Sequence, residues 1–101
     1  MIYIIWEFKV SLRHRAEFET AYRGDGAWSQ LFARDPDYVK TVFVKNAEGD
    51  FGKYLTIDVW KSREAFSEFK DHFTDEYSQL DKRCEALTES ERLIGIFEER
   101  A

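Results

Sequence analysis

The residues best suited to chemistry are an acid and an indole, Asp58 and Trp60, two positions apart in a run of β-forming residues. Alternate residues of a strand point to the same face of a sheet. If that face is turned toward the helices, Asp58 is partly buried beside a flat aromatic wall. Burial raises the pKa of a carboxylate and can suit it to act as a base near neutral pH. The alternative is a carboxylate that is paired with Lys or Arg, or exposed at the sheet edge.

His72 is the second candidate catalytic residue, because an ordinary imidazole can gain or lose a proton near neutral pH. It lies off the apolar stripe of the helix that the sequence predicts around it, and such a histidine is more often simply solvated. Cys84 falls on that stripe. We expect it to be buried, since a free cysteine behaves as a small hydrophobe.

A metal site would need three or more converging His, Cys or carboxylate ligands. His14, His72 and Cys84 show no such spacing, so we predict no metal. The glycine pair in Gly24-Asp25-Gly26 follows a predicted helix. A dinucleotide-binding glycine pattern must instead follow a strand, so these glycines do not indicate such a site. The sequence carries no phosphate-binding loop, serine-centred elbow or flavin pattern. We predict no cofactor.

Aromatic residues make up 17% of the chain. One interpretation is a core packed with rings. The other is that some rings line a ligand pocket or a subunit interface, where aromatic residues are enriched. A core of Phe would be simpler, because the polar tips of buried Tyr and Trp need partners. The candidate substrate-binding residues are therefore Trp6, Trp28, Tyr54 and Trp60, with Phe69 and Phe73 from the long helix.

The elements that must position these residues follow from hydrophobic periodicity. Alternation of apolar residues with β-branched and aromatic side chains predicts strands, and apolar residues at i, i+3 and i+4 predict helices. Ser11 and Ser62 stand where the two main helical stretches begin, as expected of N-caps. The predicted strands are 2–10, 38–45, 53–60 and 92–98, and the predicted helices are 11–23, a short one at 28–32, and a long one from 62 with a break at Thr74-Asp75.

This order, β-α-β-β-α-β, is typical of the ferredoxin-like α+β fold, a four-stranded antiparallel sheet with helices on one face. The sequence contains no repeat and no linker, so we expect one domain over residues 1–101. The second face of the sheet also carries apolar residues, which must be buried against something. Another copy of the chain is the simplest cover, and we predict a two-fold homodimer.

Charge and length exclude several classes of partner. The net charge is −5 with no basic run, which argues against nucleic acid and against an anionic membrane surface. The apolar run at residues 1–6 is too short for a signal peptide or a membrane span. Cys84 is the only cysteine, so no internal disulfide can form, which fits a reducing compartment. We expect a cytoplasmic protein.

Three stretches carry a resemblance to a known family: residues 26–32 (GAWSQLF), 54–62 (YLTIDVWKS) and 94–97 (IGIF). Together with Tyr38, Thr41, Phe69 and scattered positions from Tyr77 to Glu91, they span nearly the whole chain. In these residues the chain resembles the antibiotic-biosynthesis-monooxygenase-like family, within the dimeric α/β-barrel superfamily.

The resemblance implies two chains whose sheets pack into a barrel, with a pocket between each sheet and its helices. Some members of the family are cofactor-free oxygenases that oxidise polycyclic phenols or quinols with O2, and others degrade haem. The haem-degrading branch has an Asn in the first strand, a Trp ending the third strand and a His on the next helix. Only Trp60 matches that set, so haem degradation is not expected.

The sequence is therefore compatible with three functions. The first is a cofactor-independent monooxygenase that oxidises an aromatic or polycyclic small molecule with O2, with a titratable group inside a closed pocket. The second is a non-catalytic dimeric module that binds a small hydrophobic molecule, with a similar pocket but no base. The third is a structural or interaction protein whose aromatic residues serve only the core and the dimer interface.

Overall fold

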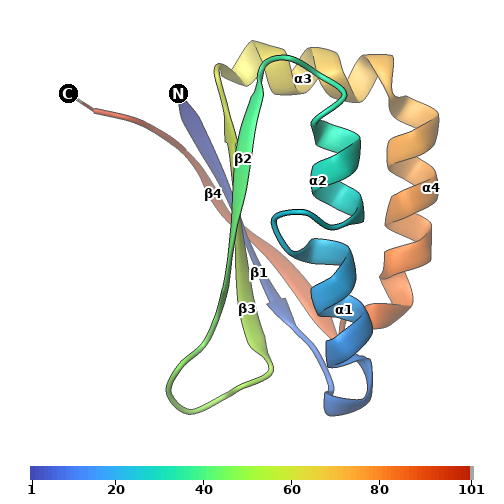
Figure 1. Ribbon diagram of the computed structural model, residues 1–101. Helices are drawn as coiled ribbons and strands as arrows, with labels where there is room; N and C mark the ends of the chain where they lie inside the picture. The colour runs from blue at the N-terminus through green and yellow to red at the C-terminus, as the bar shows by residue number, and fades with distance from the viewer. Residues whose placement is uncertain (101) are drawn as a thin grey trace.

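The structure is a computed structural model that describes residues 1–100. Four strands form one antiparallel sheet in the order β2-β3-β1-β4, which confirms the predicted ferredoxin-like α+β fold (Figure 1). Strand β4 begins at Ser90, two residues before the predicted start. The strands are β1 (Ile2–Lys9), β2 (Tyr38–Lys45), β3 (Lys53–Trp60) and β4 (Ser90–Glu98).

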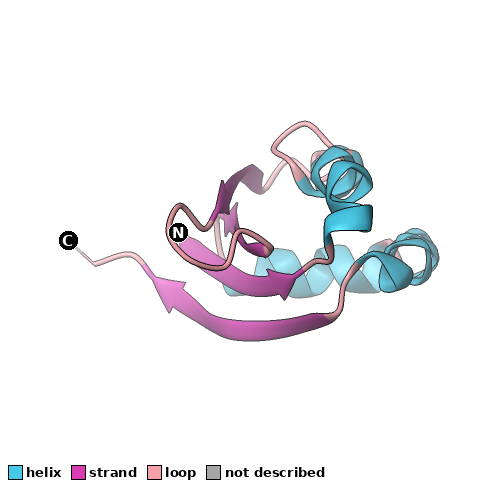
Figure 2. Ribbon diagram, turned by 90° about the horizontal axis from the view of Figure 1, so that it is seen from below, coloured by secondary structure: helices cyan, strands magenta, loops and turns pink. Residues whose placement is uncertain are grey.

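The helices all lie on one side of the sheet (Figures 1 and 2). The first predicted helix is divided, because its start at Leu12–His14 is a 3₁₀ turn. A second 3₁₀ turn, Glu85–Leu87, links the last helix to β4. The α-helices are α1 (Arg15–Tyr22), α2 (Ala27–Phe32), α3 (Arg63–His72) and α4 (Thr74–Cys84).

The predicted start and break of the long helix are confirmed. The Ser62 hydroxyl oxygen accepts a hydrogen bond from the Ala65 backbone N–H at 3.1 Å, which caps α3. At Phe73 the backbone leaves the helical region, with φ −112° and ψ 35°. The Thr74 hydroxyl donates to the carbonyl of Lys70 at 2.8 Å, which satisfies one of the free carbonyls at the end of α3. The break gives α3 and α4 separate directions (Figure 1).

The sheet face that carries Asp58 is the face covered by helices. On β3, Tyr54, Thr56, Asp58 and Trp60 are all buried. The register pairs Asp58 with Ile4 of β1 on one side and with Thr41 of β2 on the other. The sequence left open which face is inner, since both carry apolar residues, and the helices decide it.

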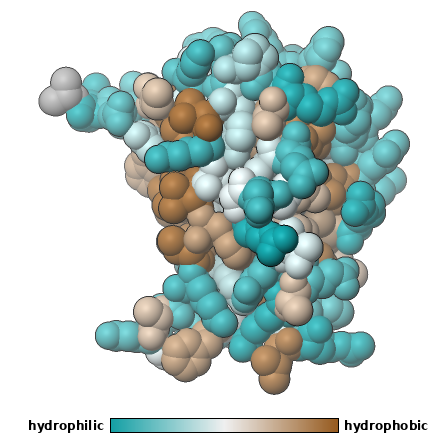
Figure 3. Space-filling view, in the orientation of Figure 1, coloured by the Kyte–Doolittle hydropathy of each residue, from teal (hydrophilic) through white to brown (hydrophobic). Residues whose placement is uncertain are grey.

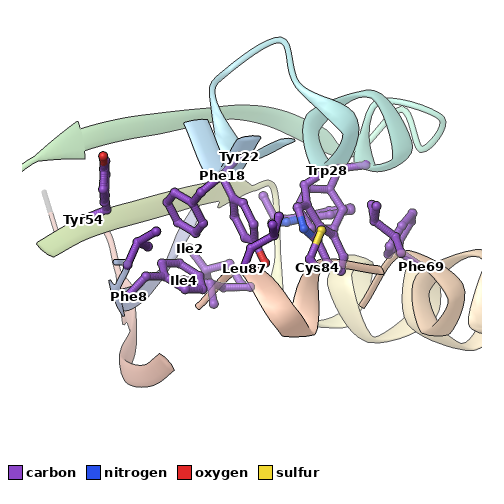
Figure 4. Packing of buried hydrophobic residues seen from close by; sticks show 14 of the residues in the cluster. Ile2, Ile4, Phe8, Phe18, Tyr22, Trp28, Tyr54, Phe69, Cys84 and Leu87 are labelled. Atoms are coloured by element: carbon purple, nitrogen blue, oxygen red, sulfur yellow. The ribbon is translucent and has the colours of Figure 1, made fainter. Parts of the chain in front are cut away.

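The core is a continuous layer of rings between the sheet and the helices. Figure 4 shows Phe18, Tyr22, Trp28 and Phe69 pointing into this layer. Phe18 stacks on Tyr22 with ring centroids 4.2 Å apart, and Trp60 lies 5.2 Å from Phe69. Such pairs add to the stabilisation from burial alone.

Gly26 sets the position of α2 and therefore of Trp28. A Cβ at Gly26 would lie 2.5 Å from the carbonyl oxygen of Thr20 and 2.6 Å from that of Ala21. Only glycine allows the start of α2 to pack this closely on α1. The close approach brings the Trp28 ring within 6.1 Å of the Tyr22 ring.

The opposite face of the sheet is apolar and uncovered in the single chain. Val42 pairs with Ile57 there, Val44 with Leu55, and Tyr3 with Phe97, and Val42, Val44 and Phe97 are exposed. Hydrophobic residues gather on the sheet side of the surface, whereas the helical side is mostly hydrophilic (Figure 3). Among residues 1–100, no helix has the length and apolar character that crossing a membrane requires.

Candidate functional site

A cavity of about 230 Å³ lies between the sheet and the helices, and it is partly open to solvent and not closed as the monooxygenase hypothesis predicted. It is larger than the engineered cavity of about 150 Å³ that is known to bind benzene. Every strand and every α-helix contributes to its wall. The lining residues are Trp6, Phe8, Tyr22, Trp28, Phe32, Thr41, Thr56, Asp58, Lys70, Tyr77, Asp81 and Glu91.

Asp58 is the buried carboxylate of this cavity. Its side chain is 8% exposed, and burial raises its pKa to about 6, although the hydrogen bond from Thr41 acts in the opposite direction. That bond runs from the Thr41 hydroxyl to Oδ1 at 2.7 Å. No Lys or Arg of the described chain forms an ion pair with Asp58. A carboxylate in this setting can take and return a proton near neutral pH.

The second oxygen of Asp58 is open to the cavity. No donor within residues 1–100 bonds Oδ2. Only the indole nitrogens of Trp28 and Trp60 are fully buried without a hydrogen-bond partner in that part of the chain. Oδ2 is therefore not fully buried, and a ligand hydroxyl group that enters the cavity can reach it.

Acidic and aromatic groups surround the rest of the cavity. Burial raises the pKa of Tyr77 to about 12, and the negative charges of Asp81, Asp58 and Glu91 add to this. Burial also raises the pKa of Glu91, again with help from Asp81. Lys70 is the cation of the wall, with its Nζ 5.0 Å from the centre of the Tyr77 ring.

The structure divides the predicted substrate-binding residues into two groups. Trp6 and Trp28 line the cavity. Tyr54, Trp60 and Phe69 are almost fully buried in the core and do not line it. Phe73 packs on Phe69 with ring centroids 5.0 Å apart and is also outside the lining. These four rings therefore belong to the core and do not form the surface of the cavity.

The two predicted catalytic residues are not brought together. Asp58 lines the cavity, whereas His72 is exposed at the end of α3, with its ring nearly perpendicular to that of Phe73 and the two ring centroids 4.8 Å apart. The reason is helical geometry. Position 72 lies off the stripe that faces the sheet, as the sequence indicated, and the break after it does not turn the side chain inward.

Several cavity residues were not predicted as site residues. Thr41 and Tyr77, which the sequence analysis named only for the family resemblance, are the most informative, because each brings a hydroxyl group to the neighbourhood of Asp58. Tyr77 lies on the apolar helical stripe, and a tyrosine within a stripe of Phe and Leu was the signal that could have found it. The others are Phe8, Tyr22, Phe32, Thr56, Lys70, Asp81 and Glu91.

The remaining titratable groups form no further centre. Within the described residues, no three His, Cys, Asp or Glu side chains converge as they would around a metal ion. Cys84 is buried, and burial raises the pKa of its thiol. It therefore fills space as the sequence predicted.

No protein-family model matches the sequence, and no curated protein matches it. Its fold is nevertheless shared by solved structures. A mutant of SnoaB, a cofactor-independent oxygenase from Streptomyces nogalater, superposes with a TM-score of 0.79 at 24% identity, over 99% of this chain and 93% of that one. A putative antibiotic biosynthesis monooxygenase from Nitrosomonas europaea superposes with a TM-score of 0.73 at 16% identity, over 98% of each chain.

A third structure, PA3566 from Pseudomonas aeruginosa, gives a TM-score of 0.74 at 13% identity, over 99% of this chain and 94% of that one. The chain thus has an antibiotic-biosynthesis-monooxygenase-like fold, as the resemblance of its sequence implied. At these identities the likeness concerns the fold, and the chemistry has to be argued from the cavity.

Proposed function

We propose that this chain is a single-domain, cofactor-independent monooxygenase that oxidises a phenolic aromatic molecule with O2. The observation that carries the proposal is Asp58, a buried carboxylate whose pKa is about 6, in an aromatic-lined cavity. The similarity in fold to SnoaB, a cofactor-independent oxygenase, supports the same chemistry. Because fold alone does not define function, the residues of the cavity have to account for each step.

The first step is removal of the phenolic proton. A phenol ring between Trp6 and Trp28 would present its hydroxyl to Oδ2 of Asp58. The carboxylate takes the proton, and the phenolate that forms can give one electron to O2, which the neutral phenol does poorly. Proton transfer to a positioned side chain contributes typically about 10²- to 10⁴-fold to a rate.

The later steps balance without an added reductant. Superoxide and the phenoxyl radical join through a new C–O bond at a ring carbon that bears hydrogen, and the resulting peroxide takes the proton back from Asp58. Loss of the C–H proton and cleavage of the O–O bond then release water and leave a second C=O group. One phenol and one O2 give one quinone and one water, so the substrate supplies all four electrons.

The test is to add one-, two- and four-ring phenols and hydroquinones to the purified protein, with O2 uptake and thermal stability recorded together. We expect a stabilising phenol to be oxidised without any added cofactor, with one O2 consumed for each quinone formed. Stabilisation without O2 uptake would instead support the non-catalytic binding module. If no phenol stabilises the protein or consumes O2, the monooxygenase proposal fails.

We also propose that the functional unit is a homodimer in the cytoplasm. The support is the uncovered apolar face of the sheet, where Val42, Val44 and Phe97 are exposed. An antiparallel sheet with two apolar faces needs a second layer, and closed two-fold pairing is the commonest solution. A lone buried Cys84 is compatible with the reducing conditions of the cytoplasm.

Sedimentation velocity tests the dimer. We expect the wild-type protein to sediment as a species of twice the chain mass of 12.0 kDa. Val42→Glu should shift it to the monomer, because the substitution places two like charges against each other in a two-fold interface. Leu12→Glu is the matched control, since Leu12 is exposed in the 3₁₀ turn after β1 and is not part of the sheet. A wild-type protein that stays monomeric at micromolar concentration would contradict the dimer.

A further inference from the structure

Two hydroxyl groups of β2 form a chain that ends on Asp58. The Tyr38 and Thr41 hydroxyl oxygens are 2.6 Å apart, and the Thr41 hydroxyl donates to Asp58 Oδ1 at 2.7 Å. A hydroxyl has one proton to donate. Since that of Thr41 is used on Asp58, Tyr38 must be the donor in the bond to Thr41. When Asp58 is ionised, both O–H groups therefore donate toward it: Tyr38 donates to Thr41, and Thr41 donates to Asp58.

A β-bulge makes this chain possible. Residues three apart in a regular strand face opposite sides of the sheet. In β2 the register with β3 shifts between Tyr38 and Lys40, so Tyr38 pairs with Trp60 and Thr41 pairs with Asp58. The extra residue brings both hydroxyls to the helix-covered face, and bulges commonly re-aim a side chain in this way.

The ring of Tyr38 is held in place by its neighbours. Its centroid lies 5.5 Å from that of Phe32 on α2 and 5.3 Å from that of Trp60 on β3. Both neighbours are buried. The hydroxyl at the tip of Tyr38 is thus fixed from two elements, and the orientation of the Thr41 hydroxyl follows from it.

We propose that Tyr38 and Thr41 are positioning residues for Asp58, a role that rests on the proposed function. Through the Thr41 hydroxyl they give Oδ1 of Asp58 a hydrogen-bond donor in a fixed position. This leaves Oδ2, which has no donor within residues 1–100, turned toward the substrate hydroxyl. Neither residue touches the reacting atoms in this role. Their contribution is to hold the carboxylate in one rotamer and to stabilise its charged form until substrate arrives.

Other charged and titratable groups also face Asp58 across the cavity. They are Tyr22 on α1, Lys70 on α3, Tyr77 and Asp81 on α4, and Glu91 on β4, while β1 contributes the uncharged Trp6. Their effects on Asp58 remain in any variant of Tyr38 or Thr41. A change in the titration of Asp58 in those variants therefore reports the hydroxyl chain.

The test is a carboxyl ¹³C NMR titration of Asp58 in the ligand-free protein, with the Asp58→Asn variant used to assign its signal. Thr41→Val removes the hydroxyl at nearly constant shape, and we expect it to raise the pKa of Asp58 by about 1. Tyr38→Phe should raise that pKa by less, since it weakens the chain without removing the direct donor. Thr41→Ser should restore the wild-type titration. Tyr3→Phe is the matched control, because the Tyr3 hydroxyl bonds Glu99 and not this chain.

The pH dependence of kcat/KM gives the second readout. The rising limb should move to higher pH in Thr41→Val by the same amount as the NMR titration. An unchanged Asp58 titration in a folded Thr41→Val protein would overturn the positioning role even if phenols are oxidised. Conversely, a shifted titration in a protein that oxidises no phenol would leave the hydroxyl chain in place and remove the proposed oxygenase function.

Discussion

Asp58→Asn is expected to lower kcat/KM for phenol oxidation by about 10²- to 10⁴-fold, the usual contribution of a general base. The amide has the shape of the carboxylate, and its oxygen can still accept the bond that Thr41 donates to Oδ1 at 2.7 Å. The change therefore removes the basic group and keeps the cavity. Steady-state O2 uptake with the best phenol of the panel measures the loss, and ligand-induced stabilisation should persist.

The pH profile of the wild-type enzyme sharpens this prediction. The base must be ionised to act, and the pKa of Asp58 is about 6. The value of kcat/KM should therefore rise with pH through about 6 and level off above it, whereas Asp58→Asn should be flat over that range. Asp71→Asn, an exposed change on α3, is the matched control and should keep wild-type kinetics. Full activity in Asp58→Asn would rule out Asp58 as the base.

His72→Ala separates the cavity from the sequence-based hypothesis for that histidine. The side chain is exposed and lies outside the cavity lining. We expect no change in activity.

The fold could be predicted because its signals are local. Alternation along residues 2–10 and 53–60, the Ser62 cap and the break near Thr74 each depend on a few neighbouring residues. The 3₁₀ turn at Leu12–His14 was not predicted. Because 3₁₀ turns are frequent at the ends of α-helices, the apolar pattern of the helix does not show where such a turn gives way to an α-helix.

The candidate site was predictable only in part, because its members are selected by tertiary packing. Asp58 stood out as the only charged residue on the strand face that it shares with Tyr54, Thr56 and Trp60. Sequence periodicity shows that a ring is buried but not whether it borders a cavity, so Trp28 and Phe69 could not be separated. The sequence named Thr41 only for the family resemblance, and its place beside Asp58 could not be predicted for another reason. The bulge before it changes which face it shares, and a bulge depends on pairing with β3.

The second large effect concerns stability, and it does not depend on the catalytic proposal. Burial raises the pKa of Asp58 from its ordinary 3.8 to about 6. The folded protein thus holds this proton more tightly than the unfolded chain. Below about pH 4 the Asp58 carboxyl group is protonated and does not lower the free energy of unfolding. As the pH rises the group ionises and destabilises the fold, and this effect is complete above about pH 6. The full effect is about 3 kcal/mol at neutral pH.

Asp58→Asn removes this cost, so it should raise the free energy of unfolding by up to about 3 kcal/mol at pH 7.5 relative to its effect at pH 4. Urea unfolding at matched protein concentration, carried out at several pH values for both proteins, measures the difference. Tyr77, whose pKa the charge of Asp58 helps raise to about 12, does not titrate in this pH range, and the remaining titratable groups are the same in both proteins. Asp71→Asn, which replaces an exposed carboxylate on α3 outside the cavity, is the matched control.

If the stability difference between Asp58→Asn and the wild type did not depend on pH, Asp58 would be as well solvated in the folded protein as in the unfolded chain. It would then not be a base near neutral pH. The expected result instead links the two large effects. The same desolvation that makes the carboxylate basic enough to take a phenolic proton lowers the stability of the fold at working pH, as in other active sites that trade stability for function. One substitution should therefore make the protein more stable and much less active, and a carboxylate with only a structural role would not give that combination.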